Sequence, residues 1–124
     1  MRRSDRHYLL AAALVTVIAG LSRRTVIRLA VNGDSMRPTL EPGDRLLVVR
    51  ARLRPGHLVA FRDPRRCERT MVKRVAARGP DGLRVLGDNA GASTDSRTFG
   101  PVPLAGVRGR AVYRYFPDSR RGLL

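Results

Sequence analysis

The sequence is poor in the residues on which many small proteins build a scaffold or a metal site. Its 124 residues include one cysteine, two histidines and no tryptophan. A single cysteine, Cys67, cannot form an internal disulfide, so the fold does not depend on one. One cysteine and two histidines at this spacing do not assemble a metal site either. We therefore expect no internal disulfide and no metal site.

Lysine is almost absent, although the chain is strongly basic. Lys73 is the only lysine among 25 basic residues, and with 10 acidic residues the net charge is +15. Such a charge has three possible explanations: binding to nucleic acid, attraction to an anionic membrane, or a compositional bias that places arginine wherever a soluble cation is needed. Few aromatic residues, scattered arginines and the lack of a zinc-finger, helix-turn-helix or aromatic RNA-binding motif argue against nucleic acid. We favour the compositional bias, helped by attraction to membrane lipid.

Long hydrophobic runs are missing too. The apolar stretch at 8–21, YLLAAALVTVIAGL, lies between basic segments and falls short of the roughly 20 residues of a typical transmembrane helix. We favour a retained membrane anchor over a helix packed on protein, and both over a cleaved signal peptide, because no Ala-x-Ala site follows. Arginines on both flanks leave the side of the membrane open, and a cytoplasmic location stays an alternative.

Beyond residue 24 the sequence changes to short runs rich in Val, Leu, Ile and aromatic residues. These runs predict strands at 25–31, 45–50, 57–62, 70–75, 83–86 and 106–116. Between them, EPGD, RPGH and GPDG are typical of tight turns that use glycine for positive φ. The polar run RDPRRCER at 62–69 reads as a loop that carries Cys67 on the surface. The sequence predicts a mainly β fold: an N-terminal segment with an apolar helix (1–24), a compact β domain (25–118) and a basic tail (119–124).

The histidines are poorly placed for a Ser-His-Asp triad. His7 precedes the apolar stretch and His57 directly follows a Pro-Gly turn, so we expect both to face solvent. A serine can instead be activated by a lysine. The candidate serine is Ser35, in the segment NGDSMRPTL at 32–40. Pro38 stiffens this segment, and such a loop can hold a hydroxyl and its own N–H in one orientation. An ordinary Gly-Asp-Ser turn would have the same local sequence.

Lys73 is the candidate base. A lysine can act as a base only after its amine has lost the proton. In water its pKa of about 10.4 prevents this at pH 7, but burial among apolar groups lowers that pKa. An alternating strand over MVKRV places Lys73 on one face with Met71 and Val75. Arginine cannot replace it, since guanidinium stays protonated in proteins. The alternative is that one lysine survives by chance in an arginine-biased chain.

A third segment, GDNAGASTDSRTFG at 87–100, is dense in Gly, Asp, Asn and Ser. Taken alone, it has the composition of a long polar loop. It also offers the Ser93 hydroxyl as a partner for a neutral lysine, and Asp95 with Arg97 as an ion pair that braces the loop.

With these three segments together, the chain resembles the type I signal peptidase family of serine proteases. The nucleophile box matches at Ser35-Met36-x-Pro38-Thr39-Leu40, the base box at Lys73-Arg74, and the third box at Gly87-Asp88-Asn89 and Ser93-x-Asp95-Ser96-Arg97-x-x-Gly100. The resemblance implies that Ser35 is the acylating nucleophile, with Met36 beside it in the box, and Lys73 the general base. Ser93 would orient the lysine amine, and Asp95 and Arg97 would form a salt bridge.

The resemblance also implies a fold, a kind of substrate, and a reaction that needs no metal or cofactor. The fold would be a mainly β catalytic domain near a membrane, to which a precursor's N-terminal segment adds as a β-strand. The short catalytic domain and the C-terminal stretch at 109–124 resemble a small subgroup described as nickel-type superoxide dismutase maturation proteases. In that subgroup the partner would be the nickel superoxide dismutase precursor. Gly33 stands where some members have a serine that contributes to the oxyanion hole, so the hole would use the Ser35 N–H.

Three other functions compete with propeptide removal. A general type I signal peptidase would cleave exported preproteins with the same boxes. A self-cleaving repressor-like protein would use the same Ser/Lys pair, but Pro38-Thr39-Leu40 and the third box argue against it. A basic module that binds membrane or nucleic acid without catalysis would explain the charge, but not the lone lysine.

Overall fold

The computed structural model describes residues 6–15 and 26–124. Residues 6–15 form a helix with exposed side chains, and the rest of the described chain is mainly β. The remainder of the predicted apolar segment, 16–21, lies outside the described residues. Within the described part, no helix is long and apolar enough to cross a membrane.

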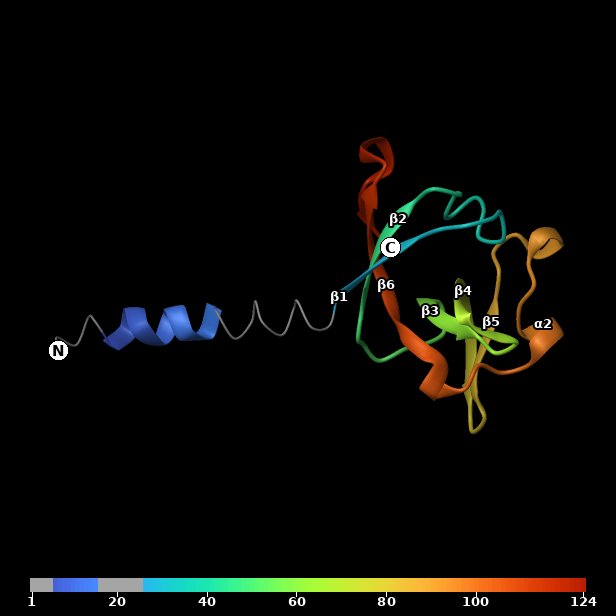
Figure 1. Ribbon diagram of the computed structural model, residues 1–124, viewed down its shortest axis with the longest axis horizontal. Coiled ribbons are helices and arrows are strands. Elements are labelled where there is room, and N and C mark those ends of the chain that lie inside the picture. The colour runs from blue at the N-terminus through green and yellow to red at the C-terminus, as the bar shows by residue number, and fades with distance from the viewer. Residues whose placement is uncertain (1–5, 16–25) are drawn as a thin grey trace.

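The β domain is one antiparallel sheet that curls on itself (Figure 1). The sheet order is β1-β2-β6-β3-β4-β5, with β7 paired to β6. The strands are β1 (Val26–Ala30), β2 (Arg45–Val49), β3 (Leu58–Asp63), β4 (Arg66–Gly79), β5 (Gly82–Leu86), β6 (Val107–Phe116) and β7 (Gly122–Leu123). Short helical turns complete the domain: η1 (Ala90–Ala92), α2 (Ser96–Phe99), η2 (Leu104–Gly106) and η3 (Asp118–Arg120). The predicted mainly β fold is confirmed.

Strand alternation divides the core into two clusters, because β3 and β4 are buried on both faces. Val72 of β4 packs with one cluster, which includes Met36, Leu40, Leu46 and Val48. Met71 and Val75, on the opposite face of the same strand, pack with the other cluster, which includes Val59, Phe61, Leu83 and Val85. As predicted, all three turns use glycine at positive φ: Gly43 at 90°, Gly56 at 94° and Gly82 at 126°.

The prediction of a loop at 62–69 was wrong. These residues belong to a hairpin. Residues 62–63 end β3, residues 64–65 form the turn, and β4 begins at Arg66, which pairs with Asp63. The turn is held by the buried Asp63 carboxylate, which accepts hydrogen bonds from the backbone N–H and the guanidinium of Arg65. Cys67 is exposed on this hairpin.

The last residues pack on the domain. β7 pairs with β6, and Arg120 of η3 forms ion pairs with Glu41 and the buried Asp44. Arg114 of β6 also reaches Asp44, at 3.2 Å, and donates to the Thr39 carbonyl at 2.9 Å. The C-terminal segment therefore holds the far end of the loop that carries Ser35.

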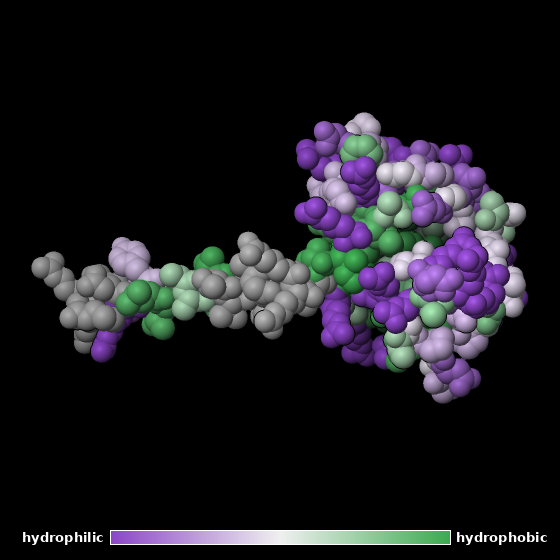
Figure 2. Space-filling model, in the orientation of Figure 1, coloured by the Kyte–Doolittle hydropathy of each residue, from purple (hydrophilic) through white to green (hydrophobic). Residues whose placement is uncertain are grey.

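The surface mixes hydrophilic and apolar areas (Figure 2). An apolar area is visible where β1 lies, and Val26, the first residue of that strand, is exposed. Much of the rest of this face is hydrophilic.

Candidate active site

The loop after β1 carries Ser35 on a tight turn. The Arg37 N–H donates to the Asp34 carbonyl at 3.2 Å, and the Leu40 N–H donates to the Met36 carbonyl at 2.9 Å. Met36 and Leu40 are buried in the core and anchor the turn, whereas Ser35, between exposed Asp34 and buried Met36, is half-buried. The Met36 side chain thereby fixes the backbone next to Ser35.

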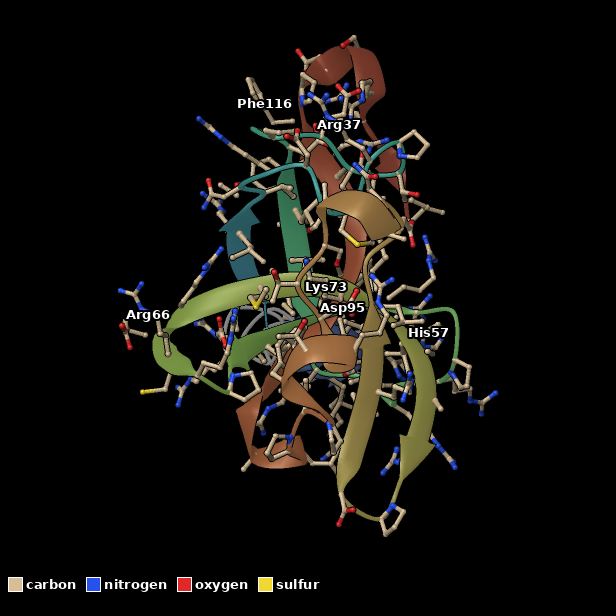
Figure 3. The ribbon with its side chains drawn as sticks, turned by 90° about the vertical axis from the view of Figure 1, so that its right-hand side faces the viewer. Arg37, His57, Arg66, Lys73, Asp95 and Phe116 are labelled. Carbon is tan, nitrogen blue, oxygen red and sulfur yellow. The ribbon has the colours of Figure 1, made fainter. Side chains whose placement is uncertain are left out.

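Lys73 lies in the middle of β4, with only 3% of its surface exposed. Burial lowers the pKa of its amine, and the positive charge of Arg69 lowers it too, while Asp95 and Asp63 act in the opposite direction. Within the described residues, no hydrogen bond or ion pair holds the amine. Figure 3 shows Lys73 beside Asp95 near the middle of the domain.

Ser35 and Lys73 line the same groove, of about 490 Å³. One wall is the end of β1 and the Ser35 loop, from Leu29 to Met36. The other wall is the β3–β4 hairpin and β4, with Arg65 and residues 68–73, and the segment after β5 adds Ala92 and Thr94. The structure thus brings the predicted nucleophile and the predicted base to one cavity.

The groove lies between two strand edges that have no partner among residues 26–124. β1 pairs only with β2, on its other side. β4 pairs with β3 along one edge, but β5 covers its second edge only from Arg74 onward. Residues 66–73 of β4 therefore keep a free edge beside Lys73, and an extended peptide can add to such an edge.

Asp95 organises the segment at 87–100 from a fully buried position. Its carboxylate accepts from the Gly87 N–H at 2.9 Å, from the Ser93 hydroxyl at 2.8 Å and from Arg97 Nε at 2.9 Å, and it caps α2. These donors, Arg97 first, hold the pKa of the Asp95 carboxyl far below its usual range. The Ser93 hydroxyl donates to Asp95, so its oxygen keeps lone pairs for another donor.

Gly87 is the point at which the third segment meets the Ser35 loop. A Cβ on Gly87 would lie 2.1 Å from Ser93 Oγ and 2.7 Å from the Ser35 carbonyl oxygen. Two residues later, the Asn89 N–H donates to that same carbonyl at 2.8 Å. The Asn89 side chain also donates to the Asp34 carbonyl, at 3.1 Å. Glycine is therefore required by close packing here, and Asn89 fixes the peptide groups on both sides of the Ser35 Cα atom.

Asp88 joins the three segments and had no role in the sequence prediction. It pairs with Arg74 at 2.7 Å and accepts from the Thr39 hydroxyl at 2.6 Å. Arg74 entered the sequence prediction only as the second residue of the base box, beside Lys73. The signal was present in the sequence, since Thr39, Arg74 and Asp88 each fall inside one of the three boxes, but their mutual contact is a tertiary property.

The two histidines lie outside the groove. His7 is exposed in the N-terminal helix. His57 is half-buried, and its Nδ1 accepts from the Arg54 N–H at 3.1 Å, so the expectation that it faces solvent holds only in part. Figure 3 shows His57 apart from Lys73. In the described part of the chain, no three histidine, cysteine or acidic side chains are grouped to hold a metal ion.

Comparison with known proteins identifies the family. The family model for "Signal peptidase, peptidase S26" matches residues 5–85 and 80–116. The chain belongs to the S26 signal peptidase family. The predicted family is thereby confirmed, and with it a peptidase as the kind of protein.

Several curated members of this family are similar along most of the chain. One is the mitochondrial ATP-independent inner membrane protease subunit 1a of Arabidopsis thaliana, 33% identical over 76% of this chain and 73% of its own length. Another is the probable signal peptidase I-1 of Synechocystis, 30% identical over the same shares. The mitochondrial inner membrane protease subunit 2 of Danio rerio is 32% identical over 73% of this chain and 64% of its own length.

Proposed function

We propose that this chain is a serine endopeptidase in which Ser35 is the nucleophile and neutral Lys73 is the general base. The observation that carries the proposal is that Ser35 and the chain's only lysine line one groove, and that burial lowers the pKa of that lysine. A neutral amine can accept a hydroxyl proton at a pH where a solvated ammonium cannot.

The reaction follows the acyl-enzyme route. Lys73 takes the Ser35 hydroxyl proton as Oγ attacks the scissile carbonyl carbon, which gives a tetrahedral intermediate. The protonated lysine then gives its proton to the leaving amine, and the C–N bond breaks. Water, deprotonated by the same lysine, attacks the ester and releases the acid and free Ser35. The Ser35 N–H is the proposed oxyanion donor, since Gly33 has no side chain to contribute.

Ser93, Asp95 and Arg97 act as positioning residues in this proposal. The Ser93 hydroxyl, held by Asp95, would accept a hydrogen bond from the Lys73 amine and direct its lone pair to Ser35. The guanidinium of Arg97 donates two hydrogen bonds to the Asp95 carboxylate and so largely compensates its negative charge. Asp95 thereby holds Ser93 in place while its charge raises the lysine pKa less than a free carboxylate would.

The proposed substrate is an N-terminal signal segment or propeptide of a precursor protein, which adds in extended form to the free strand edges of the groove. Because the chain resembles nickel superoxide dismutase maturation proteases, the precursor of nickel superoxide dismutase is the specific candidate substrate. General processing of exported preproteins is the alternative, and the relative named a probable signal peptidase favours it. Membrane association through residues 8–21 is part of the proposal in either case.

The test is cleavage of precursor proteins by full-length protein and single variants. Ser35→Ala and Lys73→Arg are each expected to lower the cleavage rate by at least about a thousandfold. The matched control is Arg84→Lys, the reverse exchange at an exposed strand position, which should cleave normally. Substantial activity in Lys73→Arg would disprove the neutral-amine mechanism.

Two further measurements complete this test. The rate should rise with pH through an apparent pKa below the ordinary lysine value of about 10.4, and a limb at that value would contradict a desolvated amine. Incubation with nickel superoxide dismutase precursor and with an exported preprotein decides between the two substrates. Selective removal of the dismutase propeptide supports the maturation role, and preference for the preprotein supports general processing.

A further inference from the structure

We infer that Arg69 makes the groove selective for a substrate with an acidic side chain near the scissile bond. The position of the scissile bond in this inference rests on the proposed function. The charges that line the groove are independent of it. Those are Asp34, Arg65, Glu68, Arg69 and Lys73.

Every charged group of the groove except Arg69 is already compensated or neutral. Asp34 pairs with Arg37 at 3.1 Å, and Glu68 pairs with Arg66 at 3.3 Å. Arg65 pairs with Asp63 at 3.0 Å and lies over the Phe99 ring. Lys73 has a lowered pKa and is the proposed neutral base.

Arg69 is exposed, and within residues 26–124 its side chain forms no hydrogen bond or ion pair. Its charge nevertheless acts inside the site, because it lowers the pKa of Lys73. Its charge also acts on the buried Asp63 carboxylate, but that carboxylate is already hydrogen-bonded by Arg65. The groove therefore presents one positive charge without an ion-pair partner of its own to whatever lies in it. A substrate carboxylate is the partner that such a charge recognises.

Strand geometry gives the distance between this charge and the reaction centre. Arg69 lies four residues before Lys73 on β4, at an irregularity where residues 67–69 have no partner on β3, and both side chains line the groove. At about 3.3 Å per residue, four residues of extended chain span at most about 13 Å. An extended peptide along the same edge rises at the same rate. The residue that faces Arg69 therefore lies within about four residues of the scissile bond.

The position of Arg69 is set by the hairpin that the sequence did not predict. Figure 3 shows Arg66 at the far end of this hairpin from Lys73, and Arg69 lies between the two along β4. Arg69 occupies the part of β4 that β5 leaves uncovered. A peptide added to that edge passes the guanidinium directly.

The experiment uses the full-length protein and a series of peptides that share one parent sequence, taken from the N-terminal segment of a candidate precursor. A single Asp, Asn or Lys is placed in turn at each position, and kcat/KM is measured. At one position near the scissile bond, Asp is expected to exceed Asn by roughly threefold to fivefold, as for a partly exposed ion pair. Arg69→Gln should bring that ratio to about one, and Arg69→Glu should reverse the preference towards Lys. The ratio corrects for any effect of Arg69 on Lys73 itself.

Arg84→Gln is the matched control, because it removes an exposed arginine from β5, outside the groove, and should keep the Asp preference. The same peptides are also bound to the Ser35→Ala protein. Cleavage without any Asp preference, or a preference that survives Arg69→Gln, overturns the inference and leaves the proposed function intact. Asp-selective binding that depends on Arg69, without cleavage by the wild type, supports the inference and overturns the proposed function. If the protein shows neither cleavage nor Asp-selective binding, the inference and the proposed function are both overturned.

Discussion

At the scale of single residues, Lys73 shows how burial changes what a side chain can do. Arginine at this position would keep its proton and remain a buried cation with no partner. Lysine can give up its proton more readily instead, because burial on the apolar strand face lowers the pKa of its amine. The burial on which the proposed role as a base depends also changes the stability of the folded protein with pH.

Comparison with Lys73→Met tests this effect on stability. In the unfolded chain Lys73 holds its proton up to about pH 10.4, whereas in the folded chain it releases the proton at a lower pH. Between these two values the unfolded state binds more protons, so the free energy of unfolding of the wild type rises with pH. Relative to Lys73→Met, we expect a rise of about 1.4 kcal/mol per pH unit inside that window.

Urea unfolding at a series of pH values from neutral to alkaline provides the measurement. The methionine side chain has a similar length and no charge, so it keeps the packing of the strand face. If the unfolding free energies of the wild type and Lys73→Met, plotted against pH, stay parallel across this range, the amine titrates in the folded protein as it does in water.

At the scale of elements, the sheet order brings together loops that are distant in the sequence. The Ser35 loop and the segment after β5 lie on the same side of the domain (Figure 1). They meet backbone to backbone at Gly87 and Asn89, with no space for a side chain at Gly87. Ser35, the proposed nucleophile, is therefore positioned by the segment after β5 as well as by its own turn.

Gly87→Ala is expected to disturb this contact. Its methyl group would overlap Ser93 Oγ and the Ser35 carbonyl, and overpacking of this kind costs about 1–3 kcal/mol of unfolding free energy. Because both displaced groups belong to the proposed site, kcat should fall more than the loss of folded protein explains. Thermal unfolding and kcat are measured on the same samples.

Gly91→Ala is the matched control, since a methyl group on that glycine would have no atom within 4 Å and the glycine has no positive φ. It should change the unfolding free energy by less than about 0.5 kcal/mol and leave kcat unaltered. Equal effects of the two substitutions would mean that the contact at Gly87 does not position Ser35.

Most of these elements could be predicted from the sequence, because strand alternation and Pro-Gly turns are local signals. The hairpin at 62–69 could not, since its polar residues resemble a loop and only pairing with β3 makes them a strand. The three boxes indicated which residues matter. Their joining through Asp88, and the free edge of β4 beside Arg69, follow from tertiary pairing that no local pattern contains.

At the scale of the whole molecule, the net charge of +15 acts on a substrate before it reaches the groove. A long-range field raises the rate of encounter with an acidic peptide and is screened by salt. The contact with Arg69 acts on the bound peptide over a few ångströms and is screened less. The two effects therefore differ in their dependence on ionic strength.

We expect kcat/KM for an acidic peptide to fall several-fold between about 10 mM and 150 mM salt, as the Debye length shortens from about 30 Å to about 8 Å. The value of kcat should stay nearly constant, because steering changes encounter and not the chemical step. An uncharged peptide of the same parent sequence is the control and should show little salt dependence. In Arg69→Gln the salt dependence should persist, since 24 basic residues remain. A salt dependence that disappears with Arg69 would place the whole electrostatic effect in the groove and none in the overall charge.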